Sequence, residues 1–225
     1  MKEKLAIIFL VVIYGVGFAS IGLGLMPQLV YATPINLLLS LAIVFIFDQH
    51  KIKSLIWFSV LVFSLGYGIE VLGVQSGNIF GEYSYGKILG FKIWDTPPMI
   101  GVNWLLLVIT AGNLVDQTLP KSGTLLKITI ASTLMLLFDL LIEPIAILWT
   151  MWTWVSAEVP IQNYIAWWLI ASVMFGVYYH FLGKQVNKVA SALFILQLGF
   201  FALLNLSRII SVSYTHLTLP TNREV

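Results

Sequence analysis

Two carboxyl groups lie four residues apart in a strongly apolar part of this chain. Asp139 and Glu143 are the only charged residues in the stretch 128–149. Residues at i and i+4 share one face of a helix, so both carboxyl groups are expected to point the same way. A charged side chain at membrane depth costs about 2.5–3.5 kcal/mol on insertion scales, so it usually marks a proton-handling site, an ion path or a buried polar network. Glu70 adds a third carboxyl group in a second apolar stretch.

The composition predicts the elements that must position these carboxyl groups. Of 225 residues, 59% are hydrophobic and 10% are charged, and the mean hydropathy is +0.94. A soluble domain of this size would lack a polar surface. Most of the apolar stretches approach the ~20 residues that cross ~30 Å of hydrocarbon. They cover residues 5–25, 31–47, 54–75, 98–115, 125–149, 161–181 and 189–207. We therefore predict an all-α, polytopic membrane bundle of about seven helices.

The basic residues predict the orientation of this bundle. One side of a seven-span arrangement holds Lys2, Lys4, Lys51, Lys53, Lys121, Lys127, Lys184 and Lys188, whereas the other holds Lys87, Lys92 and Arg208. By the positive-inside rule the N-terminus is cytoplasmic, in a multi-pass protein of the cytoplasmic membrane. The first apolar run, about 21 residues long, exceeds the usual signal-peptide core, so an uncleaved span is predicted.

Composition and spacing also limit the partners and cofactors. The basic residues flank spans rather than forming a basic patch, so no nucleic-acid partner is expected. The chain has no cysteine, which excludes a disulfide framework and a thiolate metal site. No His, Asp and Glu spacing matches a metal site well, so we expect neither metal nor cofactor. A carboxylate-bound metal stays an open alternative.

Four spans are predicted to bring polar groups to the same outer depth. Such convergence of residues far apart in sequence is typical of a functional site within a membrane. The polar residues are Glu70, Asn103, Trp104, Asp139, Glu143, Gln162 and Asn163. Most tryptophans also fall toward the outer side, which indicates either an interfacial belt or rings that line a pocket. The better pocket candidates are Trp152, Trp154 and Trp167.

The longest connection, residues 73–98, is rich in glycine and tyrosine. Glycine permits positive φ and close backbone approach, so this loop is predicted to be a structured, turn-rich cap. Phe80, Tyr83 and Tyr85 could then fold over the outer end of the bundle, although a plain surface loop is an alternative. At the other end of the chain, residues 211–225 are polar and unpatterned. We interpret 1–210 as the membrane domain and 211–225 as a non-native tail from adaptor read-through, or a disordered one.

Two segments taken together resemble a membrane carotenoid-biosynthesis family, that of the carotenoid 1′,2′-hydratases and bisanhydrobacterioruberin hydratases. The first is GYGIEVLG at 66–73, continuing through Tyr83 and Tyr85 to GVNW at 101–104. The second is DLLIEPIA at 139–146, followed by WTW at 152–154 and PIQNY at 160–164 with Trp167. The resemblance covers roughly residues 60–205 and includes polar residues at membrane depth.

The resemblance implies a lipid-soluble substrate, the ψ end of a linear carotenoid, within membrane lipid and beside other carotenoid-pathway enzymes. It implies addition of water across the terminal 1,2 double bond to give a tertiary alcohol. Protonation of this double bond needs a carboxylic acid, and two neighbouring carboxyl groups tend to share one proton. We expect Asp139 to be the acid, Glu143 the base that activates water, and Glu70 a third partner or the alternative acid. The expected substrate-binding residues are Tyr83, Tyr85, Asn103, Trp104, Trp152, Trp154, Gln162, Asn163 and Trp167.

Three other functions stay open on the sequence. A membrane carotenoid cyclase or isomerase would begin with the same protonation, but a neighbouring double bond would capture the cation. An amide cluster of Asn103, Gln162 and Asn163 that holds water would favour hydration. A proton-coupled transporter would need polar residues that continue to the cytoplasmic face. In a structural membrane protein the carboxyl groups would merely join helices by hydrogen bonds.

Overall fold

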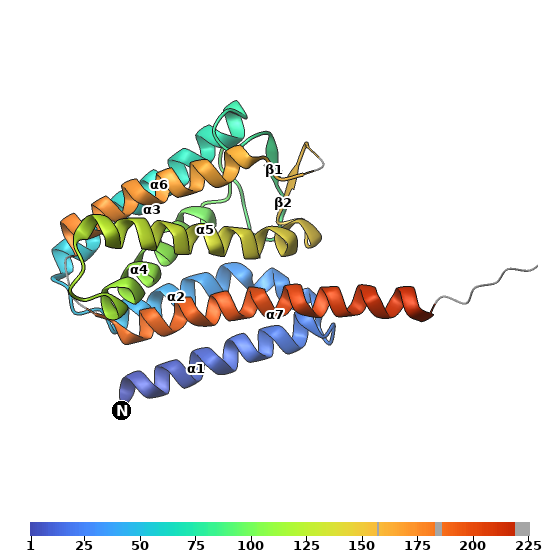
Figure 1. Cartoon of the computed structure of the whole chain (residues 1–225), viewed down its shortest axis with the longest axis horizontal. Helices are drawn as coiled ribbons and strands as arrows, with labels where there is room; N and C mark the ends of the chain where they lie inside the picture. Colours follow the sequence, from blue (N-terminus) through green and yellow to red (C-terminus); the bar gives the residue numbers. More distant parts are fainter. Residues whose placement is uncertain (157, 183–185, 219–225) are drawn as a thin grey trace, which may run out of the picture.

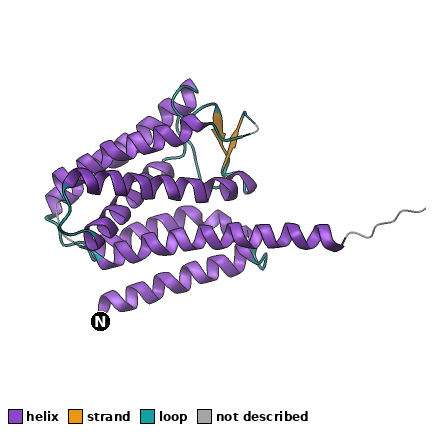
Figure 2. Ribbon diagram, in the orientation of Figure 1, coloured by secondary structure: helices purple, strands orange, loops and turns teal. Residues whose placement is uncertain are grey.

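The computed structural model describes residues 1–156, 158–182 and 186–218, with side chains described through residue 210. Within these ranges seven helices are long and apolar enough to cross a membrane, which confirms the predicted multi-pass all-α bundle (Figures 1 and 2). The helices are α1 (Lys2–Gly17), α2 (Thr33–Ile46), α3 (Ile52–Ser76), α4 (Met99–Thr118), α5 (Thr124–Leu148), α6 (Ile161–Phe181) and α7 (Lys188–Thr218). A π-helical turn (Phe18–Gly22) extends α1, and a 3-10 helix (Pro27–Ala32) precedes α2 and lengthens the shortest predicted span.

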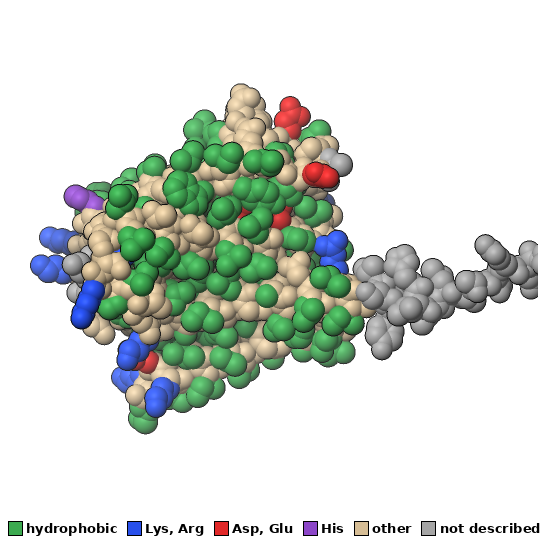
Figure 3. Space-filling model, viewed as in Figure 1, with side chains coloured by type: hydrophobic (Ala, Val, Ile, Leu, Met, Phe, Trp, Pro, Cys, Tyr) green, Lys and Arg blue, Asp and Glu red, His purple; other side chains and the backbone are tan. Residues whose placement is uncertain are grey.

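Helix α4 is the centre of the bundle. In its most apolar window 89% of the residues are buried, against 39% or less for every other span. It packs against α2, α3, α5, α6 and α7, whereas α1 packs against α7 at one edge of the molecule (Figure 1). The other helices therefore expose apolar side chains, such as Leu38, Ile56 and Leu169, on their outward faces (Figure 3). This pattern is the one expected where lipid, rather than water, surrounds the bundle.

The two ends of the bundle differ in charge. Most Lys and Arg side chains visible in Figure 3 gather at the end where the N-terminus lies. The connections from α2 to α3, from α4 to α5 and from α6 to α7 reach this same end (Figure 1). The three remaining connections meet at the opposite end. The fold thus separates the basic residues as the sequence predicts, and a cytoplasmic N-terminus stays a prediction.

Lys127 differs from the role that its position in the sequence suggests. The sequence predicts a basic residue that flanks a span, but Lys127 lies within α5 and its side chain is buried in the bundle. Its Nζ lies 2.6 Å from Oδ1 of Asp116 in α4, and the Tyr178 hydroxyl donates to Oδ2 of the same carboxylate at 3.3 Å. A paired buried charge costs far less than an isolated one, so the ion pair joins α4 to α5 near the basic end.

A two-stranded antiparallel ribbon closes the opposite end. Strand β1 (Tyr83–Tyr85) pairs with β2 (Trp152–Trp154), with Tyr83 opposite Trp154 and Tyr85 opposite Trp152. Successive side chains in a strand point to opposite faces, so the two tyrosines and two tryptophans share one face, and Ser84 and Thr153 point outward. The predicted cap therefore exists, but it contains a strand, and residues 73–76 still belong to α3.

The ribbon depends on a close backbone contact at Gly86. The Gly86 amide donates to the carbonyl of Met151 at 2.8 Å. A Cβ atom on Gly86 would lie 1.8 Å from the carbonyl oxygen of Thr150, so only glycine fits there. Beyond the ribbon, α7 runs without interruption to Thr218. Residues 219–225 of the predicted tail lie outside the described residues, and the boundary at residue 210 stays a prediction.

Candidate active site

Three carboxyl groups from two helices meet beneath the ribbon. Glu70 comes from α3, and Asp139 and Glu143 come from one face of α5. Their exposed fractions are 2%, 1% and 3%, so all three are shielded from the surroundings. Together with Asn163 of α6 they line a cavity of about 20 Å³, which is room for about one water molecule.

Glu70 is the carboxyl group with the most hydrogen-bond donors. Its Oε2 accepts from the Tyr83 hydroxyl at 2.6 Å and from the Tyr85 hydroxyl at 2.7 Å, and its Oε1 accepts from Nε1 of Trp104 at 2.9 Å. Burial, and next the charge of Glu70, raise the pKa of Tyr83 and of Tyr85, so both hydroxyls stay protonated donors at neutral pH. Hydrogen bonds of this kind favour the ionised carboxylate.

A glycine lets Trp104 reach Glu70. Gly66 precedes Glu70 by four residues and lies on the same face of α3. A Cβ atom on Gly66 would lie 2.6 Å from Cβ of Trp104, so the absence of a side chain allows α4 to approach α3 closely. This approach brings the indole nitrogen of Trp104 to the carboxyl group.

Glu143 and Asp139 have fewer donors than Glu70. Oε2 of Glu143 accepts from the indole nitrogens of Trp152 at 3.1 Å and Trp154 at 3.2 Å. Oδ2 of Asp139 accepts from Nδ2 of Asn163 at 2.9 Å. Within the described part of the chain, Oε1 of Glu143 and Oδ1 of Asp139 accept no hydrogen bond. The three carboxyl groups therefore have three, two and one donors, with Asp139 the least supported as an anion.

Aromatic rings enclose the carboxyl groups. The indoles of Trp104 and Trp167 stack with centroids 4.1 Å apart, and the rings of Tyr83 and Trp154 lie 5.0 Å apart. Tyr85 meets Trp152 edge to face at 6.2 Å. Aromatic faces attract a nearby cation, and more strongly where water is excluded. The cavity thus combines acidic groups with a surface suited to positive charge.

Most of the predicted site residues meet at this cavity. The residues lining it include Glu70, Tyr83, Tyr85, Asp139, Glu143, Trp152, Trp154, Asn163 and Trp167, and Trp104 contacts it through Glu70. Phe80, which the sequence suggested for the cap, and Ile100, which carries no chemical signal, complete the lining. Among the described residues no group of three His, Cys, Asp or Glu side chains is arranged to hold a metal ion.

The predicted amide cluster does not form. Asn163 lines the cavity, but Asn103 lines a separate, larger pocket, and exposed Gln162 donates to the carbonyl of Asn78. Neighbouring residues on an α-helix point about 100° apart, so Asn103 cannot share the direction of Trp104, nor Gln162 that of Asn163. Of the three amides, Asn163 is therefore the one placed to contact a water molecule in the cavity.

The larger pocket adjoins the acidic cavity. It has a volume of about 400 Å³, within the range of ligand pockets, and its lining comes mainly from apolar residues of α1, α2, α4, α5 and α7. Ile100 and Trp152 line both spaces, so they form the wall between them. The arrangement is an apolar chamber beside an acidic chamber.

Comparison with known proteins gives two matches at the level of sequence. Residues 31–221 match the family described as "Carotenoid biosynthesis protein". The chain is also 35% identical over 113 residues to the bisanhydrobacterioruberin hydratase of Haloarcula japonica. That alignment covers 48% of this chain and 39% of the archaeal protein, so it spans well under two thirds of the archaeal protein's length. No solved structure matches the chain.

Proposed function

Because this chain belongs to the carotenoid biosynthesis protein family, we propose that it hydrates the terminal double bond of a linear carotenoid. The single observation that carries this proposal is the cavity shared by Glu70, Asp139 and Glu143. It has room for one water molecule and lies beside an apolar pocket. The archaeal relative named as a hydratase supports the same reaction class.

In the proposed mechanism Asp139 supplies the proton. A carboxyl group holds a proton more readily when fewer donors stabilise its anion, and Asp139 accepts only from Asn163 in the described structure. Glu70, with three donors, is the best-supported anion and is assigned to positioning and to charge balance rather than to proton transfer. The sequence left two roles open for Glu70, a third partner or the alternative acid, and we assign it the first.

The proposed reaction balances with substrate and water alone. The Asp139 proton bonds to C2 of the 1,2 double bond, whose electron pair forms the new C–H bond and leaves a tertiary cation at C1. The water oxygen bonds to C1 and loses a proton to Glu143, and proton transfer back to Asp139 restores the starting state. General acid–base catalysis of this kind contributes about 10²–10⁴-fold to rate. No electrons leave the system, so the reaction requires no redox cofactor.

The aromatic enclosure suits the cation that this reaction forms. The rings of Trp167, Tyr83 and Trp154 line the cavity, and the indole of Trp104 stacks on that of Trp167. A desolvated aromatic face contributes about 2 kcal/mol to the binding of a cation. Because a ground-state carotenoid is neutral, this attraction acts on the cationic intermediate and on the transition state that leads to it.

The proposal is tested in a bacterium that accumulates lycopene or γ-carotene in its membranes. Expression of the full chain should give a more polar pigment heavier by one water, measured by chromatography and mass spectrometry. Asp139→Asn should remove this product while the protein remains in the membrane at the native level. A product of unchanged mass would instead indicate cyclisation or isomerisation, and full activity of Asp139→Asn would exclude Asp139 as the acid.

A further inference from the structure

The acidic cavity is too small for the chain end that the proposed reaction needs. Its volume is about 20 Å³, which is room for about one water molecule. The end of a linear carotenoid is a double bond with two methyl groups on its last carbon, and this group is much larger than a water molecule. The cavity must therefore widen on one side before C2 of the substrate can approach the Asp139 carboxyl group.

Ile100 is the least constrained part of the cavity lining. Every other residue that lines the cavity either forms a hydrogen bond through its side chain or packs its ring against a neighbouring ring. The Ile100 side chain is aliphatic, so it can form neither contact and is held by nonpolar packing alone. It can change its rotamer without breaking a hydrogen bond, so the cavity opens most easily at Ile100.

Trp152 forms the other edge of the wall at this point. Ile100 and Trp152 line both the cavity and the large pocket, and their exposed fractions are 3% and 8%. Thr150, two residues before Trp152, has a φ of 53°. A β-branched residue at positive φ is an outlier, and strain of this kind is concentrated at active sites and switch regions. The backbone is therefore strained close to one edge of the wall.

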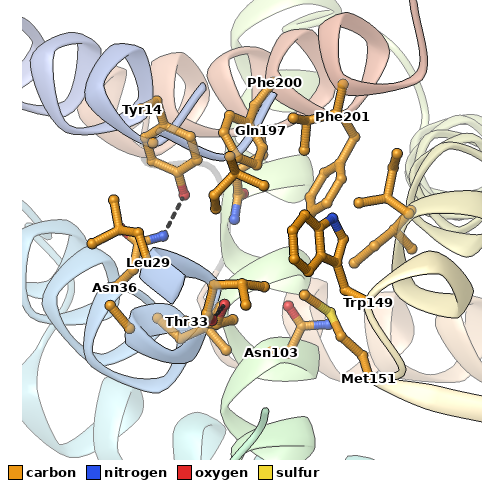
Figure 4. A pocket seen from close by; sticks show the side chains of 18 of the residues that line it. Tyr14, Leu29, Thr33, Asn36, Asn103, Trp149, Met151, Gln197, Phe200 and Phe201 are labelled. Atoms are coloured by element: carbon orange, nitrogen blue, oxygen red, sulfur yellow. Dashed lines mark hydrogen bonds between the residues drawn. The ribbon is translucent and has the colours of Figure 1, made fainter. Parts of the chain in front are cut away.

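Beyond the wall lies a space large enough for part of a long apolar chain. The large pocket has a volume of about 400 Å³. Figure 4 shows Met151, which directly precedes Trp152, on one side of this pocket together with Asn103. Val12 of α1 and Ile35 of α2 also line the pocket, and their exposed fractions are 56% and 69%. The pocket thus reaches the surface that faces lipid, so a substrate dissolved in the membrane can enter it without crossing water.

We propose that the substrate end passes from the large pocket into the acidic cavity between Ile100 and Trp152, and that Ile100 controls this passage. The inference rests on the proposed function for the identity of the substrate. The part of the chain that the pocket does not hold remains in lipid. Ile100 determines which chain ends reach the carboxyl groups, and it takes no part in proton transfer.

The test follows the position of a chain end without turnover. The probe is squalene, a linear isoprenoid hydrocarbon, with a photoreactive diazirine in place of one terminal double bond. The full-length protein in lipid nanodiscs is irradiated with the probe, and the labelled residues are identified by mass spectrometry. Labels are expected both in the large pocket, at residues such as Phe200 and Phe201, and in the cavity, at residues such as Asp139 and Glu143. Labels confined to either space would overturn the proposed route.

A larger side chain at position 100 isolates the role of Ile100. Ile100→Trp fills the passage, so labels in the cavity should fall by at least about tenfold, the lower end of the effect of one methylene in a hydrophobic pocket. Labels in the large pocket should continue, whereas a general structural defect would reduce both sets alike. Ile165→Trp, at a 56% exposed position on α6, is the matched control and should keep both sets. Unchanged labels in the cavity of Ile100→Trp, or an equal loss of both sets, would overturn the proposal.

A smaller side chain at the same position should have the opposite effect. Ile100→Ala widens the passage, so labels in the cavity should rise relative to labels in the large pocket. This variant also decides the question if Ile100→Trp does not reach the membrane. Unchanged or weaker labels in the cavity of Ile100→Ala would then overturn the proposal.

The outcome is separable from that of the proposed hydration, because labelling needs no reaction at the carboxyl groups. Cavity labels that depend on Ile100, in a protein that makes no hydrated pigment, would refute the proposed function alone. If both proposals hold, Ile100→Trp should also lower the amount of hydrated pigment by at least about tenfold. Hydrated pigment that Ile100→Trp leaves unchanged would refute this inference alone.

Discussion

Removing the two tyrosine hydroxyls that contact Glu70 tests whether that carboxyl group is ionised in the folded protein. Tyr83→Phe and Tyr85→Phe each keep the ring, so the edge-to-face contact between them, with centroids 5.5 Å apart, is preserved. Each substitution deletes one donor to Oε2. Oε1 keeps its hydrogen bond from Trp104 in every variant.

The expected magnitude follows from the charge of the acceptor. A hydrogen bond to a charged group contributes about 1.5–3 kcal/mol, against about 0.5–1.5 kcal/mol for a neutral pair. Each single variant should therefore lower the free energy of unfolding by about 1.5–3 kcal/mol. The double variant should lose more than either single variant but less than their sum, because Glu70 can take up a proton once its oxygen lacks donors.

The assay is equilibrium unfolding of the four proteins in lipid–detergent bicelles, completed as a double-mutant cycle. Tyr31→Phe is the control, since Tyr31 is 64% exposed, and it should change the unfolding free energy by less than about 0.5 kcal/mol. Losses of only about 0.5 kcal/mol in the single variants, with strict additivity in the double variant, would refute the assignment of Glu70 as the anion. The same variants should also make less hydrated pigment, because fewer hydrogen bonds would hold Glu70 in place.

Three further predictions concern packing, the buried ion pair and orientation. Gly66→Ala should lower the unfolding free energy by about 1–3 kcal/mol and reduce activity, because the new methyl group displaces Trp104. Gly68→Ala is the control and should do neither, because no atom lies within 4 Å of its Cβ position. Equal effects of the two substitutions in an unfolding assay would contradict this account. Lys127→Met should cost about 3–5 kcal/mol by leaving Asp116 unpaired, and adding Asp116→Leu should recover most of that loss in the same assay. A reporter enzyme that is active only outside the cytoplasm should work when inserted between α3 and α4 and fail between α4 and α5, and the reverse pattern would overturn the predicted cytoplasmic N-terminus.

The parts of the fold that depend on local pattern were predictable from the sequence. Apolar runs of sufficient length specify the spans because hydrocarbon tolerates few charges. The four-residue spacing of Asp139 and Glu143 places them on one face of α5 whatever else the chain does. The predicted meeting of these groups with Glu70 and Asn163 rested on a common depth in the bundle, and the structure places all four at one cavity.

The parts that depend on rotation of helices and on distant pairing were not predictable. Depth along a span does not define its rotation, so Asn103 and Gln162 were grouped with residues that point another way. The sequence predicts a flanking charge at Lys127 because its partner, Asp116, lies on a different helix. The ribbon was missed as a pair of strands, although the alternation of aromatic and small polar residues in YSY and WTW is the period-two pattern of a strand.

The pairing of β1 with β2 also has a consequence for biogenesis. The two strands belong to different connections, one made before α4 and the other after α5. During synthesis, Glu70 therefore enters the membrane with α3 well before Trp152 and Trp154 exist to complete the enclosure. Until the connection that follows α5 has been made, the acidic centre has neither its roof nor the two indole donors to Glu143. Closure of the ribbon thus marks the point at which a set of inserted helices becomes an enclosed chamber.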